Sequence, residues 1–189
     1  VYKEFQRMSS AKESYGYMEK VRDVAVIELL FGTGVRVAEL CSLRYSDIGT
    51  GFSSVRVNGK GNKERCIQII NEHIRKALQD YFVLFSQKIE RQNYFFVNRL
   101  GNRLSEQSVR LMIRKYRNKC FITKNITPHV FRHTFATLLL EHDVDIKYIQ
   151  NLLGHSSIMT TQIYTHMSSE KQTEILTNRH PRNGIQVIC

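Results

Sequence analysis

Two neighbouring segments in which apolar and polar residues alternate constrain the fold of this chain most. They are SSVRVNG at 53–59 and ERCIQII at 64–70, and the turn GKGNK joins them. A period of two is typical of half-buried strands, so the pair predicts a β-hairpin, and the pattern allows a short third strand near Tyr45–Gly49. Because the rest of the chain has helical periodicity, we predict a mainly α fold with a small antiparallel β-sheet (α+β).

The first half of the chain contains three segments with the periodicity of helices. Residues 20–31 (KVRDVAVIELLF) predict a helix that Gly32 ends, and Gly34 permits a tight turn before a second helix in VRVAELCSLR. Arg36 therefore falls in or near the first turn of that second helix. Residues 72–89 predict a third helix, which a loop follows.

A helix over 106–119, capped by Ser105, is predicted to be amphipathic. Its apolar positions share one face: Val109, Met112, Ile113 and Tyr116. Three arginines recur on another face: Arg110, Arg114 and Arg117. This basic stripe suits a helix that packs on a core and faces DNA, and it equally suits an ordinary solvated face.

The next helix is predicted to begin at Thr127 and Pro128, a cap residue followed by a favoured first residue. Its periodicity directs one set of residues toward the core: Phe131, Phe135 and Leu138. It directs a second set the other way: His129, Arg132, His133 and Ala136. Further helices are predicted from about 146 to Gly154 and over 168–177, and Ser156 or Ser157 can cap a helix between them that contains Tyr164.

The length of 189 residues suits one compact domain. We divide the chain into a polar leading segment at 1–19, a folded domain at 20–177 and a C-terminal tail at 178–189. Because the first residue is Val1, we expect a fragment of a longer protein. No stretch has the roughly 18 apolar residues of a membrane span, and no signal peptide is visible.

The net charge of +11 and the pI of about 9.7 favour a partner that contains phosphate, above all nucleic acid. An anionic membrane surface fits less well, since the basic residues accompany a strong core pattern. None of the four cysteines belongs to a C-x-x-C pair, and they stand at Cys41, Cys66, Cys120 and Cys189. We therefore predict free, buried thiols in a reducing compartment rather than a disulfide framework.

Six residues could act together on a phosphodiester: Arg36, Lys60, His129, Arg132, His155 and Tyr164. Two guanidinium groups suit a tetrahedral phosphate and stabilise the added negative charge of its five-coordinate state. Histidine moves a proton near neutral pH, and a lysine on a turn can protonate a leaving oxygen. A tyrosine needs such surroundings to act as a nucleophile, because its free pKa is about 10.

Each of these residues also has a plainer interpretation. A single tyrosine on a helix usually packs against a core, and Lys60 in a glycine-rich turn could simply be solvated. Arg36 could pair with Glu39, three residues further on. His155, after a glycine that ends a helix, could cap that helix.

The spacing of His129 and His133 is half of a zinc motif, but the motif is incomplete. Val130 stands where the glutamate would be, and Arg132 would place a positive charge beside the metal. The sequence also contains no P-loop and no acidic cluster for magnesium. We therefore predict no metal site and no cofactor.

The motifs that contain these residues resemble one family in their order and spacing. They are GTGVRVAEL (32–40), GKGNKER (59–65), TPHVFRHTFAT (127–137) and LLGHSSIMTTQIYTH (152–166). Over about residues 20 to 175 the chain resembles the tyrosine recombinase (phage integrase) family, and its GKGNKER turn is especially similar to Xer recombinases and mobile-element integrases. The resemblance implies that 20–177 is a catalytic domain, linked through 1–19 to an N-terminal core-binding domain.

The resemblance implies a role for each of the six positions. Arg36 and Arg132 would clamp the scissile phosphate, and His155 would donate a hydrogen bond to it. Lys60 would protonate the 5′-hydroxyl leaving group, and Lys63 is the less favoured candidate.

The family resemblance makes Tyr164 the nucleophile and His129 the acceptor of its proton. Cleavage would give a 3′-phosphotyrosyl link and a free 5′-hydroxyl, and a 5′-hydroxyl of the partner duplex would then attack that link. The phosphodiester energy would stay in the covalent intermediate, so neither ATP nor a metal would be needed.

The resemblance further implies double-stranded DNA as partner, a homotetramer on paired sites, accessory directionality factors, and a cytoplasmic, nucleoid-associated location. Exchange of the segment 167–189 between protomers would hold the tetramer together, although the same segment could pack on its own domain. A type IB topoisomerase-like enzyme and a DNA-binding relative that no longer cuts remain alternatives. A metal-dependent nuclease would need carboxylates that the motifs lack.

Overall fold

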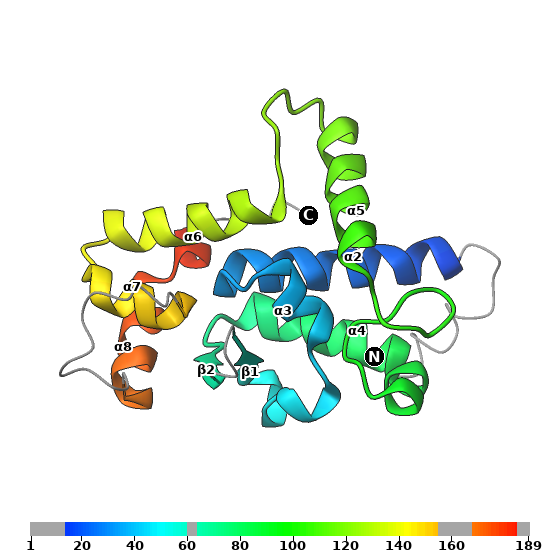
Figure 1. Cartoon of the computed structure of the whole chain (residues 1–189), viewed down its shortest axis with the longest axis horizontal. Helices are drawn as coiled ribbons and strands as arrows, with labels where there is room; N and C mark the ends of the chain where they lie inside the picture. The colour runs from blue at the N-terminus through cyan, green and yellow to red at the C-terminus, as the bar shows by residue number, and fades with distance from the viewer. Residues whose placement is uncertain (1–13, 60–63, 155–167, 185–189) are drawn as a thin grey trace.

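The computed structural model describes residues 14–59, 64–154 and 168–184, and within them the fold is mainly helical with one antiparallel pair of strands (Figure 1). This confirms the predicted fold class. The elements in chain order are α2 (Ser14–Thr33), α3 (Val37–Ser42), η1 (Tyr45–Asp47), η2 (Thr50–Phe52), β1 (Ser54–Asn58), β2 (Glu64–Gln68), α4 (Glu72–Gln92), α5 (Glu106–Lys119), α6 (Pro128–Glu141), α7 (Ile146–Leu153), α8 (Ser169–Arg179) and η3 (Pro181–Gly184), where η denotes a short 3-10 helix.

The long helix α2 crosses the middle of the molecule and packs against both α4 and α6 (Figure 1). It is longer at both ends than the predicted 20–31. Gly34, with a left-handed φ of 62°, ends it rather than Gly32, which stays within the helix. The fully buried apolar residues of α2 are Ala25, Val26, Leu29 and Leu30.

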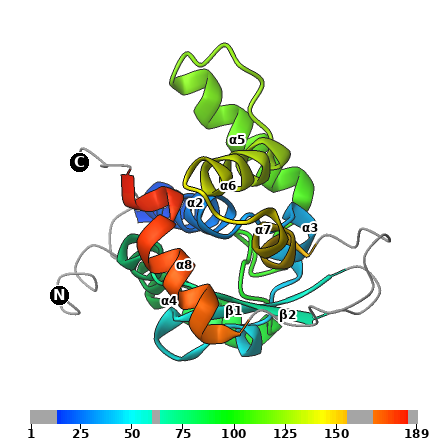
Figure 2. The same cartoon turned by 90° about the vertical axis from the view of Figure 1, so that its left-hand side faces the viewer.

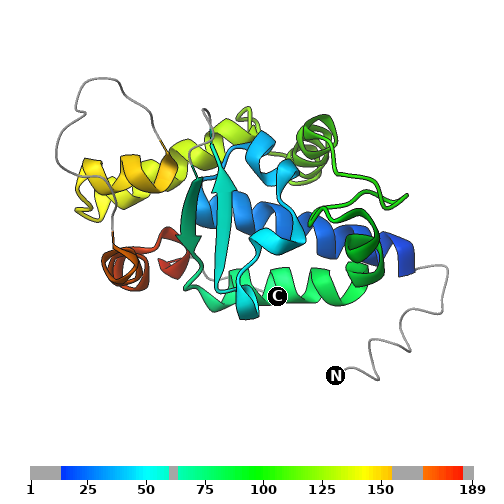
Figure 3. The ribbon, with the colours of Figure 1, turned by 60° about the horizontal axis from the view of Figure 1, so that its bottom comes forward.

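The strands β1 and β2 form the predicted hairpin, in which Val55 lies opposite Ile67 and Asn58 opposite Glu64. The third strand near 45–49 did not form. Residues 45–47 are the 3-10 helix η1, and only Ile48 pairs with β1, through an isolated bridge. Figure 3 shows the sheet across α2, with α7 and α8 to its left, α5 to its right, and α6 running from the left past the upper end of the strands.

An aromatic cluster fills the core between α4 and the segment that follows it. Its ring centroids lie 4.7 to 5.5 Å apart, and its members are Tyr81, Phe85, Phe95 and Phe96. Although Tyr81 is fully buried, its hydroxyl donates to the Phe95 carbonyl at 2.9 Å and accepts from the Val97 N–H at 3.0 Å. This one hydroxyl therefore satisfies two backbone groups that water cannot reach.

Removal of that hydroxyl should destabilise the fold. In the Tyr81→Phe variant, two buried backbone groups lose their partner, so we expect the free energy of unfolding to fall by about 1–3 kcal/mol. Urea unfolding measures this difference, and Tyr17→Phe, at an exposed tyrosine, is the control. Equal stabilities of wild type and Tyr81→Phe would contradict the prediction.

The face that α6 turns to the core differs only in part from the one that the periodicity predicted, since Phe131 is half-buried against the core as expected. Its buried residues are Pro128, Arg132, Phe135 and Leu139. The prediction that Arg132 shares the polar face with His129 and His133 is therefore wrong, while Phe135 is buried as predicted. A charged residue occupies the buried face because backbone carbonyls from other elements accept its guanidinium hydrogen bonds.

The C-terminal elements pack on the rest of the chain. Figure 2 shows α8 and η3, in orange and red, running from the sheet to α2. The helix predicted over 168–177 is α8, and residues expected in the tail continue into the core. His180 is 3% exposed and its Nε2 lies 2.8 Å from the Gly32 carbonyl. Arg182 pairs with Glu28 at 2.9 Å. The division of the chain at 19 and 177 remains a prediction.

The cysteines differ in exposure more than the sequence suggested. Cys41 is buried, as predicted, but Cys66 and Cys120 are exposed, so the prediction of buried thiols is wrong for these two. Cys66 alternates outward on a strand, and Cys120 follows the end of α5. Cys189 lies outside the described residues. None of the described helices is long and apolar enough to cross a membrane.

Candidate active site

The candidate site is built on the sharp turn between α2 and α3. Arg36 is the N-cap residue of α3, and its backbone N–H donates to Glu39 Oε2 at 2.8 Å. Its Nη1 also donates to Glu39 Oε1 at 3.0 Å. The Arg36 side chain is 40% exposed, whereas that of Glu39 is 6% exposed. Glu39 therefore fixes the start of α3 and the arginine together and leaves part of the guanidinium open to solvent.

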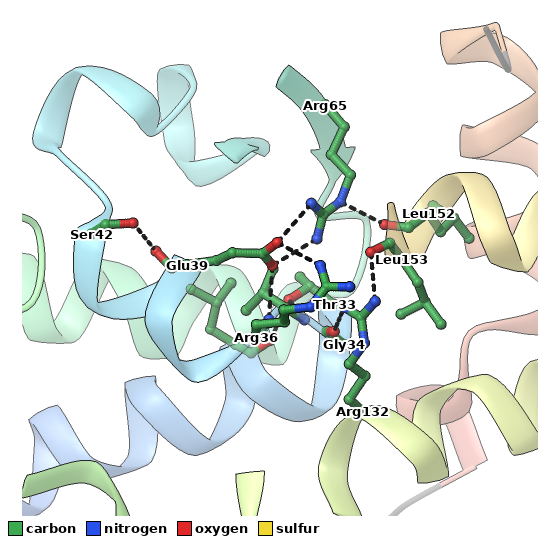
Figure 4. A network of polar contacts seen from close by, with 11 residues as sticks. Thr33, Gly34, Arg36, Glu39, Ser42, Arg65, Arg132, Leu152 and Leu153 are labelled. Atoms are coloured by element: carbon green, nitrogen blue, oxygen red, sulfur yellow. Dashed lines mark hydrogen bonds and ion pairs between the residues drawn. The ribbon is translucent and has the colours of Figure 1, made fainter. Parts of the chain in front are cut away.

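Arg65 on β2 approaches the same carboxylate from the sheet (Figure 4). Its Nη1 and Nη2 donate to the two oxygens of Glu39 at 3.1 and 2.8 Å, which is a bidentate pair. Its Nε donates to the Leu152 carbonyl at 2.9 Å. One side chain thus joins the hairpin, α3 and the last turn of α7.

Arg132 makes the corresponding connection from α6. Its Nη1 donates to the Gly34 carbonyl and its Nη2 to the Leu153 carbonyl, each at 2.7 Å. The residue is 8% exposed. Figure 4 shows its guanidinium between the α2–α3 turn and the end of α7. The two hydrogen bonds hold the planar group in one orientation.

Two glycines make this close approach possible. Gly34 has a φ of 62°, and a Cβ there would lie 2.7 Å from Leu153 Cδ2 and 2.8 Å from Phe135 Cδ1. Gly154 ends α7 with a φ of 64°, and a Cβ there would lie 2.9 Å from Arg65 Nη1. Both positions combine a left-handed backbone with a crowded site, so glycine is required for two reasons.

The cluster of Arg36, Glu39, Arg65 and Arg132 contains three positive groups and one negative group, which leaves a formal charge of +2. Burial, with a contribution from Arg36, lowers the pKa of Arg132 to about 10, so it stays protonated at neutral pH. Burial alone would raise the pKa of Glu39, but hydrogen bonds from Arg65 and from the Arg36 backbone bring it below the usual 4.5. The cluster is therefore charged at neutral pH and suited to a phosphate oxyanion.

The structure brings together two of the six predicted site residues, Arg36 and Arg132. His129 lies one turn before Arg132 on α6 and is exposed. The others lie outside the described residues: Lys60, Lys63, His155 and Tyr164. In the described ranges, no three His, Cys, Asp or Glu side chains gather as ligands for a metal ion.

The helix α5 has the two faces that the sequence predicted. Its apolar residues Val109, Met112 and Ile113 are buried. On the other side Arg110 and Arg114 are exposed and Arg117 is partly exposed. Arg110 pairs with Glu106 at 2.7 Å, and Arg117 donates to two asparagine side chains.

The sequence interpretation missed Arg65. This residue stands inside the quoted motif GKGNKER, but its alternating position on a strand predicts nothing about a partner 26 residues earlier. The sequence pairs Glu39 with Arg36, and the structure confirms this pair but also buries the carboxylate between two arginines. A buried carboxylate beside two cations is the signal that identifies both, and it exists only in three dimensions.

Comparison with known proteins identifies the family of the chain. The sequence pattern of the phage integrase family matches residues 2–171. A tyrosine recombinase of Agathobacter rectalis is 50% identical over 178 residues, which cover 94% of this chain and 58% of that protein. The tyrosine recombinase XerC of Corynebacterium glutamicum is 42% identical, over 87% of this chain and 53% of that protein. The chain thus spans just over half the length of these curated relatives.

Solved structures give the same result. The XerA recombinase superimposes with a TM-score of 0.67 at 38% identity, over 96% of this chain and 63% of that one. The XerH site-specific recombinase bound to its difH substrate, in a pre-cleavage complex, gives 0.66 at 26% identity, over 79% and 44%. Since the family pattern covers most of the sequence and the fold agrees with these neighbours, the chain belongs to the phage integrase family of tyrosine recombinases.

Proposed function

We propose that this chain is the catalytic part of a site-specific DNA recombinase that cleaves and rejoins strands through Tyr164. The observation that supports it most is the meeting of Arg36 and Arg132, from two motifs far apart in the sequence, around the α2–α3 turn. Arg132 is held rigidly there and Arg36 is partly open to solvent, as a clamp for an incoming phosphate requires.

In the proposed reaction, the Tyr164 oxygen attacks the scissile phosphorus and the bond from phosphorus to the 5′ oxygen breaks. His129 takes up the tyrosine proton, and Lys60 gives a proton to the leaving 5′ oxygen. Arg36, Arg132 and His155 stabilise the charge on the phosphate oxygens. A 5′-hydroxyl then attacks the phosphotyrosyl link, which restores a phosphodiester and releases the tyrosine, so neither ATP nor a metal takes part.

Double-stranded DNA is the proposed partner, in keeping with the charge of +11 and with the XerH complex. We propose that the basic stripe of α5 contacts the duplex, with Arg110, Arg114 and Arg117 as phosphate or base contacts.

A homotetramer that exchanges the C-terminal segment is also proposed. In the single chain α8 packs on its own domain, where Gln172 bonds Gln68 and Cys66, so exchange would have to replace these contacts. Accessory directionality factors and a nucleoid location remain predictions.

A nicked suicide substrate tests the proposed chemistry. The chain is incubated, in EDTA and without ATP, with a pool of 5′-labelled nicked duplexes of randomised sequence. Because the nick lets the 5′-hydroxyl fragment diffuse away, a 3′-phosphotyrosyl product should accumulate as label that stays on the protein in SDS. Tyr164→Phe should abolish this product, and Tyr148→Phe on α7 is the matched control and should retain it.

Three outcomes would contradict the proposal. Labelled product in Tyr164→Phe would exclude Tyr164 as the nucleophile. A requirement for magnesium would contradict the metal-free mechanism. Binding of the duplex pool without any covalent product, also in a longer protein that includes the N-terminal part, would favour the non-cutting DNA-binding relative.

A further inference from the structure

A second pair of arginines, Arg44 and Arg103, lies outside the active-site cluster, and both contact the ring of Tyr94. Tyr94 follows α4, and its ring centroid is 5.7 Å from the Arg44 guanidinium carbon and 5.4 Å from that of Arg103. Arg44 follows α3, whereas Tyr94 and Arg103 lie near the two ends of the segment between α4 and α5, so two connecting segments meet here. We call these three residues the Tyr94 clamp.

The backbone holds the Tyr94 clamp in place. Arg44 and Tyr94 form an isolated antiparallel bridge, and Phe95 N–H donates to the Leu43 carbonyl at 2.8 Å. Arg103 Nε donates to the Cys41 carbonyl at 2.8 Å, which fixes its guanidinium while the residue stays exposed. The Arg103 guanidinium is thus ordered before any ligand binds, and the ring of Tyr94 attracts both cations, which offsets part of their mutual repulsion.

Two other exposed arginines of the described chain have acidic partners, whereas Arg44 and Arg103 have the ring of Tyr94. Arg56 pairs with Asp47, and Arg110 pairs with Glu106. In the described part of the chain, neither Arg44 nor Arg103 forms an ion pair with a carboxylate; Asp47 accepts from the backbone N–H of Arg44, not from its guanidinium. The clamp therefore presents two positive charges whose remaining N–H groups are available to an anion.

The location of the clamp is continuous with the proposed DNA surface. Arg103 lies two residues before Ser105, the N-cap residue of α5, and so stands beside the start of the helix that contains the basic stripe. Arg36 and Arg44 flank α3, whose six residues correspond to a rise of about 9 Å. One duplex is long enough to contact the active-site cluster, the clamp and the α5 stripe together.

We propose that Arg44 and Arg103, stacked on Tyr94, bind two neighbouring backbone phosphates of the DNA beyond the scissile one, one phosphate each. A guanidinium that stacks on a ring keeps its in-plane N–H groups free for phosphate oxygens. Because the ring already restricts the arginine side chain, less side-chain entropy is lost when the phosphate binds. Such a contact is independent of base sequence and positions the duplex relative to the catalytic residues. The inference rests on the proposed function, because it takes DNA as the ligand.

Salt-dependent binding tests the clamp with a fluorescent duplex of mixed sequence, about 30 base pairs long, followed by anisotropy. Each lost phosphate contact should reduce the slope of log affinity against log salt by about 0.9. Arg44→Gln removes a side chain that donates no hydrogen bond in the described chain, so it should fold normally and lower the slope by about 0.9. Arg44→Gln/Arg103→Gln should lower it by about 1.8.

A matched double variant, Lys76→Gln/Lys171→Gln, removes the same charge from α4 and α8, away from α5. It should leave the slope within about 0.3 of wild type, since no phosphate contact is lost. Tyr94→Leu should weaken binding less than the double arginine variant while the charge is unchanged. Thermal unfolding confirms that each variant is folded.

The outcomes separate the clamp from the proposed function. If wild type binds the duplex and Arg44→Gln/Arg103→Gln has the same slope, the clamp is excluded and the proposed function stands. If both double variants lose the same slope, the effect is one of total charge and the clamp is again excluded. If wild type does not bind the duplex at all, the proposed function fails and the clamp fails with it.

Discussion

Strand cleavage should fall by about 1,000-fold or more when Arg132 is replaced by glutamine, because a buried arginine that stabilises a phosphoryl transition state contributes on this scale. The structure supplies the reason. Both outer nitrogens of Arg132 are used to fix its orientation, on the Gly34 and Leu153 carbonyls at 2.7 Å. Glutamine has no charge, and its single amide cannot reach both carbonyls.

The same substitution should also affect stability. One or both carbonyls lose their donor in a buried site, so the free energy of unfolding should fall by about 1–3 kcal/mol. Arg132→Lys keeps the positive charge but loses the planar guanidinium that donates to both carbonyls. Its rate of strand cleavage should therefore still be about 100-fold below that of wild type.

Cleavage of the nicked substrate, measured at a temperature where circular dichroism shows each variant to be folded, separates chemistry from stability. Lys76→Gln on α4 is the control and should cleave like wild type. If Arg132→Gln cleaves within about tenfold of wild type, the electrostatic role assigned to Arg132 is wrong.

Loss of Arg65 should be the second large effect. Arg65→Ala leaves Glu39, 6% exposed, with Arg36 as its remaining guanidinium partner, and leaves the Leu152 carbonyl without the Nε donor. Removal of one partner of a buried ion pair costs about 3 kcal/mol or more of stability. Cleavage should fall by about 10- to 100-fold, since Arg36 and the end of α7 both lose a positioning contact.

The stability effect of Arg65 should depend on pH. The folded-state pKa of Glu39 is lowered, so the carboxylate contributes stability that is present above its usual pKa of 4.5 and is lost as the pH falls through the folded-state value. The difference between wild type and Arg65→Ala should therefore be full at neutral pH and shrink in acid. Urea unfolding across this range measures it.

A double-mutant cycle with Glu39→Gln distinguishes the ion pair from general packing. A coupling free energy of about 1–3 kcal/mol between Arg65 and Glu39 is expected for a buried bidentate pair. Arg65→Lys should recover part of the stability but little of the cleavage, because an ammonium cannot bridge Glu39 and Leu152 together. A coupling below about 0.5 kcal/mol would show that Arg65 acts through packing alone.

The sequence alone determined the elements whose signals are local. The stripe of Val109, Met112 and Ile113 set the buried face of α5, and Ser105 caps that helix as predicted. The alternation of apolar and polar residues at 53–59 and 64–70 predicted the hairpin and its half-buried strands. Apolar periodicity and cap residues act over only a few neighbouring positions, so these signals can be read directly from the sequence.

Only the tertiary structure decided which charged residues are buried. Arg132 bonds carbonyls 98 and 21 residues away, and Arg65 bonds a carboxylate 26 residues earlier in the chain. Periodicity assigns an arginine to solvent, because an unpaired buried charge is costly, and the partners that remove this cost are absent until α2, α6 and α7 have packed. For the same reason, the stacking of Arg44 and Arg103 on Tyr94 could not be predicted from residues that lie in two connections far apart in the sequence.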